Sequence, residues 1–226
     1  MDNVLTLNGN MLTFGGNAIT VVDTGIVTIG GKNYTSAILP DGHRWLTLNL
    51  DLTWTGLQVG TPFPDPRDEV PAAAYYDNDE TTYGWGGLKY GLMYTYDAIV
   101  YLYQNAATLT PGWHIATNTE WNELKTLLSD QYGYGSGLKT KSTTGWKDNG
   151  NGNGNTPLDV RPSGRCRAGV FEKAGEMAEI VGLAGDPARN APSYHQWEYD
   201  SSRIVTGGMR VLNGDALYVR LVEDYV

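Results

Sequence analysis

Charge, cysteine and histidine are all scarce in this 226-residue sequence. Charged residues make up 18% of it, there are three histidines, and Cys166 is the only cysteine. One cysteine excludes an intrachain disulfide and a cysteine-based metal cage. No stretch approaches the roughly 20 apolar residues of a membrane-spanning helix, and residues 1–6 lack the basic start and apolar run of a secretory signal. The sequence therefore favours a chain that folds in a cytoplasm without a membrane partner.

Positive charge is also scarce, and the net charge is −9. A protein that grips nucleic acid needs a basic patch to displace counterions from phosphates. The tightest basic cluster, Arg161, Arg165 and Arg167, lies in an otherwise acidic chain, so we do not expect nucleic acid as a partner. Glycine (29), tyrosine (15) and tryptophan (7) are abundant instead. This composition is typical of a loop-rich fold, and tyrosine is a common contact residue of adaptable recognition surfaces.

Residues 1–31 show short alternating strands separated by turns. Asn8-Gly9 and Gly15-Gly16-Asn17 punctuate runs rich in Thr, Val, Ile and Leu, which is the pattern of β-hairpins. Two or three such strands cannot bury their own apolar face and leave unpaired edges. Two interpretations fit: an extra edge hairpin on the main domain, or an arm for assembly or attachment. We predict the arm, and with it a homotrimer.

The main domain is expected over residues 32–226, with an α+β fold. Its strands come first, two helices follow, a Gly/Asn-rich loop fills residues 132–157, and strands return at the end. Thr117 and Glu120 are spaced as a capping box for the second helix. The predicted elements are strands at 33–39 and 44–50, a helix at 95–107 opened by Thr95, a helix after Thr117, and a strand at 216–222.

An ordered set of short motifs resembles the Fibrobacter succinogenes major paralogous domain over about residues 32–224. The motifs include Trp45-Leu46, Gly112-Trp113-His114-Ile115, Thr119-Glu120-Trp121, Gly145-Trp146-Lys147-Asp148-Asn149-Gly150, Pro162-Ser163-Gly164-Arg165, Glu198-Tyr199-Asp200-Ser201-Ser202 and Val219-Arg220. The four tryptophans among them are expected to be core anchors. The resemblance implies a C-type-lectin-like fold, in the same group as formylglycine-generating-type domains and the variable proteins of diversity-generating retroelements.

In the retroelement-diversified relatives, the exposed face of the C-terminal strands and their loops is the binding surface. By that resemblance the candidate ligand-binding residues are Tyr194, His195, Gln196, Trp197, Tyr199, Arg203, Met209, Arg210 and Asn213. The chain departs from the family between Gly175 and Ser193, where it is longer, and at residues 193–197. Because side chains alternate along a strand, only Tyr194 with Gln196, or His195 with Trp197, can face outward. The alternative is that Trp197 fills the core.

Catalytic and metal-binding patterns are weak. The histidines are far apart in the sequence, and Cys166 offers no partner for the cysteine chemistry of formylglycine-generating relatives. Calcium could use the oxygen-rich run Asp77-Asn78-Asp79-Glu80, but this run lacks EF-hand spacing. The Gly/Asn run lacks the lysine of a phosphate loop. We therefore expect neither a metal site nor a cofactor.

The resemblance and the composition favour a non-enzymatic ligand-binding protein. The first hypothesis is a fibre or receptor-binding subunit of a phage virion, which recognises a glycan or protein on a bacterial surface and contacts other virion subunits through its N-terminal arm. The second is a bacterial surface adhesin of the same fold. A formylglycine-type enzyme is the alternative from another class, and the missing cysteines argue against it.

Overall fold

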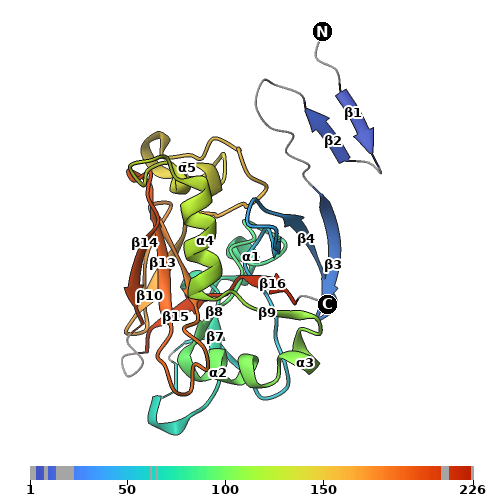
Figure 1. Ribbon diagram of the computed structural model, residues 1–226. Helices are drawn as coiled ribbons and strands as arrows, with labels where there is room; N and C mark the ends of the chain where they lie inside the picture. Colours follow the sequence, from blue (N-terminus) through green and yellow to red (C-terminus); the bar gives the residue numbers. More distant parts are fainter. Residues whose placement is uncertain are drawn as a thin grey trace.

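Three β-sheets and a few short helices organise the part of the chain that the structure describes (Figure 1). The structure is a computed structural model that describes residues 4–7, 10–13, 23–61, 63–64, 66–209 and 214–224. Its strands pair in antiparallel and mixed sheets, so the fold is a mixed α and β one with few helices. This agrees with the α+β class expected from the order of strand and helix signals.

The largest sheet has nine strands and carries most of the C-terminal half. Eight of its strands follow the order β14-β13-β12-β10-β15-β8-β7-β6. The ninth, β11, pairs with β10. The strands are β6 (Gln58–Val59), β7 (Ala72–Ala74), β8 (Met93–Thr95), β10 (Ser163–Arg167), β11 (Val170–Ala174), β12 (Met177–Gly182), β13 (Ser193–Glu198), β14 (Val205–Gly208) and β15 (Ala216–Tyr218).

The five-stranded sheet joins the start of the domain to its end, in the order β3-β4-β5-β16-β9. A separate two-stranded sheet, β1-β2, precedes it and stands apart from the rest of the chain in Figure 1. The strands are β1 (Val4–Leu7), β2 (Asn10–Thr13), β3 (Thr24–Ile29), β4 (Lys32–Ile38), β5 (Arg44–Leu46), β9 (Trp113–Ile115) and β16 (Leu221–Glu223).

The segment at 1–31 therefore contributes to two different sheets. β1 pairs with β2 in antiparallel register, with Leu7 opposite Asn10, as the hairpin pattern of this segment predicts. β3, however, pairs along its whole length with β4, and the expected boundary at residue 31 falls in the turn between them. The five-stranded sheet thus begins before residue 32. The part of the predicted β-rich segment at residues 14–22 lies outside the described residues.

The helices are short, and the two longest are those that the sequence predicts. They are α1 (Glu80–Tyr83), α2 (Tyr96–Gln104), α3 (Ala106–Leu109), α4 (Asn118–Leu128) and α5 (Ser136–Thr140), with 3-10 turns at Pro66–Asp68, Tyr76–Asn78 and Lys147–Asn149. The capping box at α4 is confirmed, since Glu120 N donates to the Thr117 side chain and Thr117 N donates to the Glu120 carboxylate. Thr95 precedes α2 without a side-chain cap. In the part of the chain that is described, no helix has the length and apolar character to cross a bilayer.

Tryptophans anchor the core between α4 and the large sheet. Trp45, Trp113, Trp121 and Trp146 are all buried, as predicted. The Trp121 ring packs against Trp45, with 4.6 Å between ring centroids. Its Nε1 donates to the backbone oxygen of Val181 in β12, 3.0 Å away. These contacts fasten α4 to β5 and β12.

The last predicted strand is divided in two, which corrects the single strand expected at 216–222. β15 belongs to the nine-stranded sheet and β16 to the five-stranded one, and Arg220 lies between them. The Arg220 side chain is fully buried and donates to the backbone oxygens of Leu46 and Thr47 and to Asn49 Oδ1. A buried guanidinium needs such acceptors, and they hold the chain at the point where it passes between the sheets.

Candidate ligand-binding site

Of the two sets of alternating side chains along β13, the set of His195 and Trp197 is the one that points into the core. Both side chains are 0% exposed. Trp197 Nε1 donates to Thr140 Oγ1 at 2.8 Å, and its ring lies edge-on to Trp121. The prediction that His195 and Trp197 contact a ligand is therefore corrected, because neither reaches the surface. Trp197 fills the core, which was the alternative drawn from the same sequence.

His195 is a neutral core residue. Its Nε2 lies 3.1 Å from Asn118 Oδ1 and its Nδ1 3.3 Å from Thr206 Oγ1. Burial, with a smaller effect of the Lys125 charge, lowers its pKa to about 3. The histidine therefore stays uncharged at neutral pH and joins α4 to β13 and β14.

Tyr194 and Gln196 lie on the opposite, outer face of β13, and both are half-buried. The Arg167 guanidinium lies 4.6 Å from the centroid of the Tyr194 ring. On the other strand, a Cβ at Gly207 would collide with that ring, so Tyr194 lies flat across β14. Gln196 donates to Glu198 at 2.7 Å. This outer face is ordered by contacts between its own side chains.

Charges beneath this face fix the position of Arg167. Its Nη1 donates to Asp215 at 2.6 Å and its Nη2 lies 2.8 Å from Glu179 Oε2. Both acidic side chains are only 1% exposed. The Glu179 contact is an ion pair by distance without the alignment of a hydrogen bond, and burial raises the pKa of Glu179 above its usual value. The main role of Arg167 is therefore structural, as the ion-pair partner of two buried carboxylates.

The remaining predicted residues do not gather around Tyr194. Met209 is buried, which corrects its assignment as a contact residue. Tyr199 is half-buried under Lys147, whose Nζ lies 5.4 Å from the ring centroid. Arg203 is exposed and stacks on Tyr134 at 3.7 Å. Arg210 and Asn213 lie outside the described residues.

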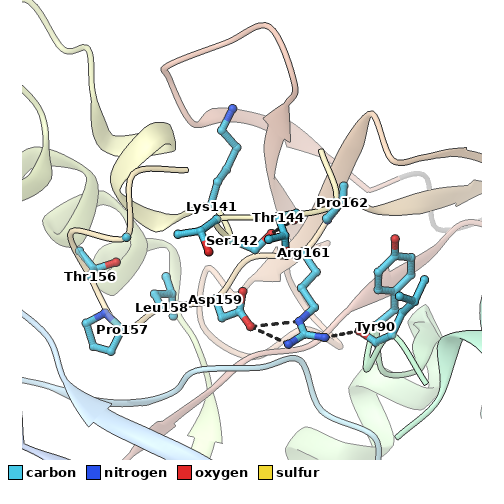
Figure 2. A pocket seen from close by; sticks show the side chains of 14 residues that line it. Tyr90, Lys141, Ser142, Thr144, Thr156, Pro157, Leu158, Asp159, Arg161 and Pro162 are labelled. Atoms are coloured by element: carbon cyan, nitrogen blue, oxygen red, sulfur yellow. Dashed lines mark hydrogen bonds and ion pairs between the residues drawn. The ribbon is translucent and has the colours of Figure 1, made fainter. Parts of the chain in front are cut away.

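A surface cleft of about 390 Å³ lies elsewhere, between three segments that are distant in sequence (Figure 2). A volume of this size suits a small ligand. Residues 141–145 and 156–162 form two walls, and the turn at Leu88 and Tyr90 closes a third side. The lining residues are Leu88, Tyr90, Lys141, Ser142, Thr143, Thr144, Gly145, Gly154, Thr156, Pro157, Leu158, Asp159, Arg161 and Pro162.

Backbone hydrogen bonds join the two walls of this cleft. Ser142 N donates to Val160 O at 2.8 Å, and Val160 N donates to Thr140 O at 3.0 Å. Gly152 packs so closely on Lys141 that a Cβ there would collide with the Lys141 carbonyl oxygen. The Gly/Asn-rich segment, expected only as a loop, therefore supports the cleft, because glycine permits this approach.

Lys141 connects the cleft to the end of β13. In Figure 2 its side chain points away from Asp159 and Arg161. Its Nζ donates to the backbone oxygens of Glu198, Tyr199 and Ser201, at 3.1, 3.3 and 3.2 Å. Burial lowers the pKa of this ammonium from its usual value. Lys141 thus holds the turn after β13 against the cleft wall.

An ion pair lies in the wall formed by residues 156–162. Arg161 Nε and Nη2 both donate to Asp159 Oδ2, at 3.0 and 2.8 Å, and Nη1 donates to the backbone oxygen of Leu88. Asp159 Oδ1 receives no hydrogen bond from any residue that the structure describes. The pair therefore holds the Asp159 carboxylate in a cleft that the hydroxyl-bearing residues Thr143 and Thr144 also line.

Titratable groups meet at one further place that the sequence did not reveal. His114 Nε2 lies 2.8 Å from Glu120 Oε1, and His43 Nδ1 lies 3.7 Å from the same oxygen. His114 Nδ1 is 2.7 Å from Asp224. The hydrogen bond to Glu120 raises the pKa of His114, against the effect of burial. His114 is thus a hydrogen-bonded structural residue.

The oxygen-rich run before α1 is occupied by its own contacts. The Asp79 side chain accepts a hydrogen bond from Thr82 N as the N-cap of α1. Asn78 Oδ1 accepts from Thr61 N, and Asn78 Nδ2 donates to Thr61 Oγ1. Across the described ranges, no three His, Cys, Asp or Glu side chains are placed to hold a metal ion.

The fold and the cleft define a mixed α and β domain with a small polar surface site. The family model of the Fibrobacter succinogenes major domain matches residues 41–222. The match covers most of the chain, which therefore belongs to this family, and it confirms the resemblance seen in the motifs. No curated protein and no solved structure shows a significant match.

Proposed function

We propose that the chain is a non-enzymatic ligand-binding protein with a C-type-lectin-like domain, and that its cleft binds a hydroxyl-rich ligand such as a sugar unit of a bacterial surface glycan. The observation that carries this proposal is the cleft itself, which is lined by the Asp159–Arg161 pair and by several threonines. The mixed α and β architecture and the family membership are compatible with the lectin-like fold.

The lining suits a sugar better than a strongly charged ligand. A sugar hydroxyl both donates and accepts, so it pairs with a carboxylate, a guanidinium and neutral hydroxyls in one site. Asp159 and Arg161 offset each other's charge, which gives little attraction for a phosphate. Leu88, Pro157 and Pro162 offer apolar surface for the C–H faces of the ring.

Cysteine-based catalysis has little support. Cys166 is fully buried, and burial raises its pKa to about 12. A thiol needs to be accessible and deprotonated to act as a nucleophile. These properties favour a binding protein over the formylglycine-type enzyme considered as an alternative.

The biological setting follows from the ligand class. A module that binds bacterial surface glycans fits a fibre or receptor-binding subunit of a phage virion, and a bacterial surface adhesin is the alternative. The β1-β2 hairpin supports the first, since it forms a sheet of its own before the domain and could attach to other virion subunits. Neighbouring genes decide between the two: tail genes favour the virion, and surface-export genes the adhesin.

The test is a screen of bacterial glycans against the full chain, followed by titration of the best ligand. We expect Asp159→Asn and Thr144→Val each to weaken binding about tenfold, which corresponds to about 1.4 kcal/mol. Gln196→Ala, on the outer face of β13, is the control and should bind as the wild type does. Unchanged melting temperatures show that the variants are folded.

Two results would contradict the proposal. Binding that survives both cleft substitutions and is lost in Gln196→Ala would place the ligand on the outer face of β13. Binding of a protein ligand without any glycan would overturn the ligand class.

A further inference from the structure

β3 is an edge strand without the features that usually protect such an edge. Within the described chain it pairs with β4 on one side only. Its six residues, Thr24-Gly25-Ile26-Val27-Thr28-Ile29, include no charge and no proline. Natural proteins commonly blunt an exposed edge with lysine, proline or a bulge. An unprotected edge of this length is therefore suited to pairing with another strand.

The turn after β3 determines which of its backbone groups face outward. Gly30 and Gly31 both have positive φ, 56° and 77°, and form a two-residue hairpin turn. In such a hairpin Ile29 and Lys32 are a hydrogen-bonded pair, and hydrogen-bonded pairs recur at every second residue. The bond from Ile38 N to Asp23 O, 3.1 Å, follows this pattern. The N–H and C=O groups of Thr24, Ile26 and Thr28 consequently point to the free edge.

The side chains of the same three residues are exposed. Ile26 is 77% exposed, the largest value among the exposed large hydrophobic side chains of the described residues. Thr24 and Thr28 flank it on the same face of the strand and are exposed as well. An apolar side chain between two threonines, above a row of outward backbone groups, is a complete surface for strand pairing.

We propose that this edge pairs with the β3 edge of a second copy of the chain, antiparallel and about a two-fold axis at Ile26. In this register Ile26 lies opposite the partner's Ile26, and Thr24 lies opposite the partner's Thr28. Each outward N–H and C=O of the three residues then meets a partner group. The two five-stranded sheets become one continuous sheet across the dimer.

The strand is complementary to itself, which favours a second copy over an unrelated partner. The two-fold register places no like charges opposite each other, pairs isoleucine with isoleucine, and pairs threonine with threonine, a favourable cross-strand combination. A contact of this kind is isologous and closes with two copies. We therefore infer a dimer through β3 in place of the trimer expected from the N-terminal segment.

Cysteine cross-linking of the full chain tests the register. Residues in a hydrogen-bonded antiparallel pair have Cα atoms about 5.5 Å apart, within the range of a disulfide. We expect Ile26→Cys to form a disulfide-linked dimer under mild oxidation. Thr24→Cys alone should not, since its copies lie about 13 Å apart along the strand, and a mixture of Thr24→Cys with Thr28→Cys should. Cys166 is buried and does not compete.

Charge substitution tests the same pairing without a covalent bond. We expect Ile26→Lys and Ile26→Glu each to be monomeric in light scattering, and their equimolar mixture to regain the dimer. Val170→Lys, at a 63% exposed position of β11, is the matched control and should dimerise as the wild type does. A monomeric wild type, a trimer, or an Ile26→Lys variant that still dimerises would overturn the proposal.

Discussion

Acidification should destabilise the protein through His195, and the size of the effect follows from its burial. The ring is 0% exposed, and burial lowers its pKa to about 3. In the unfolded chain the pKa returns to about 6.5. Between these values the unfolded state binds the proton and the folded state does not, so stability is fully present above about pH 6.5 and is lost as the pH falls toward 3.

At pH 5 the contribution is already measurable. This pH lies about 1.5 units below the pKa of the histidine in the unfolded chain, so the unfolded state binds the proton while the folded state remains neutral. The free energy of unfolding is therefore about 2 kcal/mol lower than at pH 7.5. His114 acts in the opposite direction, since its pKa is raised and its contribution fades as the pH rises. The two histidines must therefore be separated by mutation.

Urea unfolding of wild type and His195→Gln at pH 7.5 and 5 isolates the effect. We expect the free energy of unfolding to fall by about 2 kcal/mol more in the wild type than in His195→Gln over this interval. His114→Gln is the matched control, and its stability should fall more steeply than that of the wild type on acidification. Equal pH dependence in wild type and His195→Gln would refute the assignment of His195 as a neutral core residue.

Two further predictions concern the core and the oxygen-rich run before α1. Trp197→Ala should lower the free energy of unfolding by about 3–5 kcal/mol, because the ring is fully buried and its Nε1 bond to Thr140 is lost; urea unfolding measures it, and a loss below about 1 kcal/mol would contradict the core role. Thermal melts with chelator and with excess calcium should coincide, because Asp79 caps α1 and Asn78 bonds to Thr61. A stabilisation of more than about 5 °C by calcium would contradict this.

Local signals in the sequence were sufficient for several elements. Thr117 and Glu120 predicted the start of α4, because a capping box is satisfied within one turn. The hairpin pattern of the first residues predicted the pairing of β1 with β2 for a similar reason. The four family tryptophans were correctly assigned to the core, since large aromatic side chains in a loop-rich chain are its main source of buried area.

Tertiary structure alone decided which face of β13 is buried. Alternation places Tyr194 with Gln196 and His195 with Trp197, but both pairs carry one aromatic and one polar residue. The choice depends on α4, whose Trp121 covers His195 and Trp197 from another part of the chain. In the same way, the last predicted strand divides because its two halves find partners in different sheets.

The cleft depended on tertiary structure for the same reason. The turn at Leu88 meets Arg161 across 73 residues of sequence, and no local pattern predicts such a contact. The sequence by itself determined the family, the short-range turns and caps, and the identity of the core anchors, because these depend on neighbours along the chain. Which side chains reach the surface, and which loops meet to form a site, was decided by the packing of distant segments against one another.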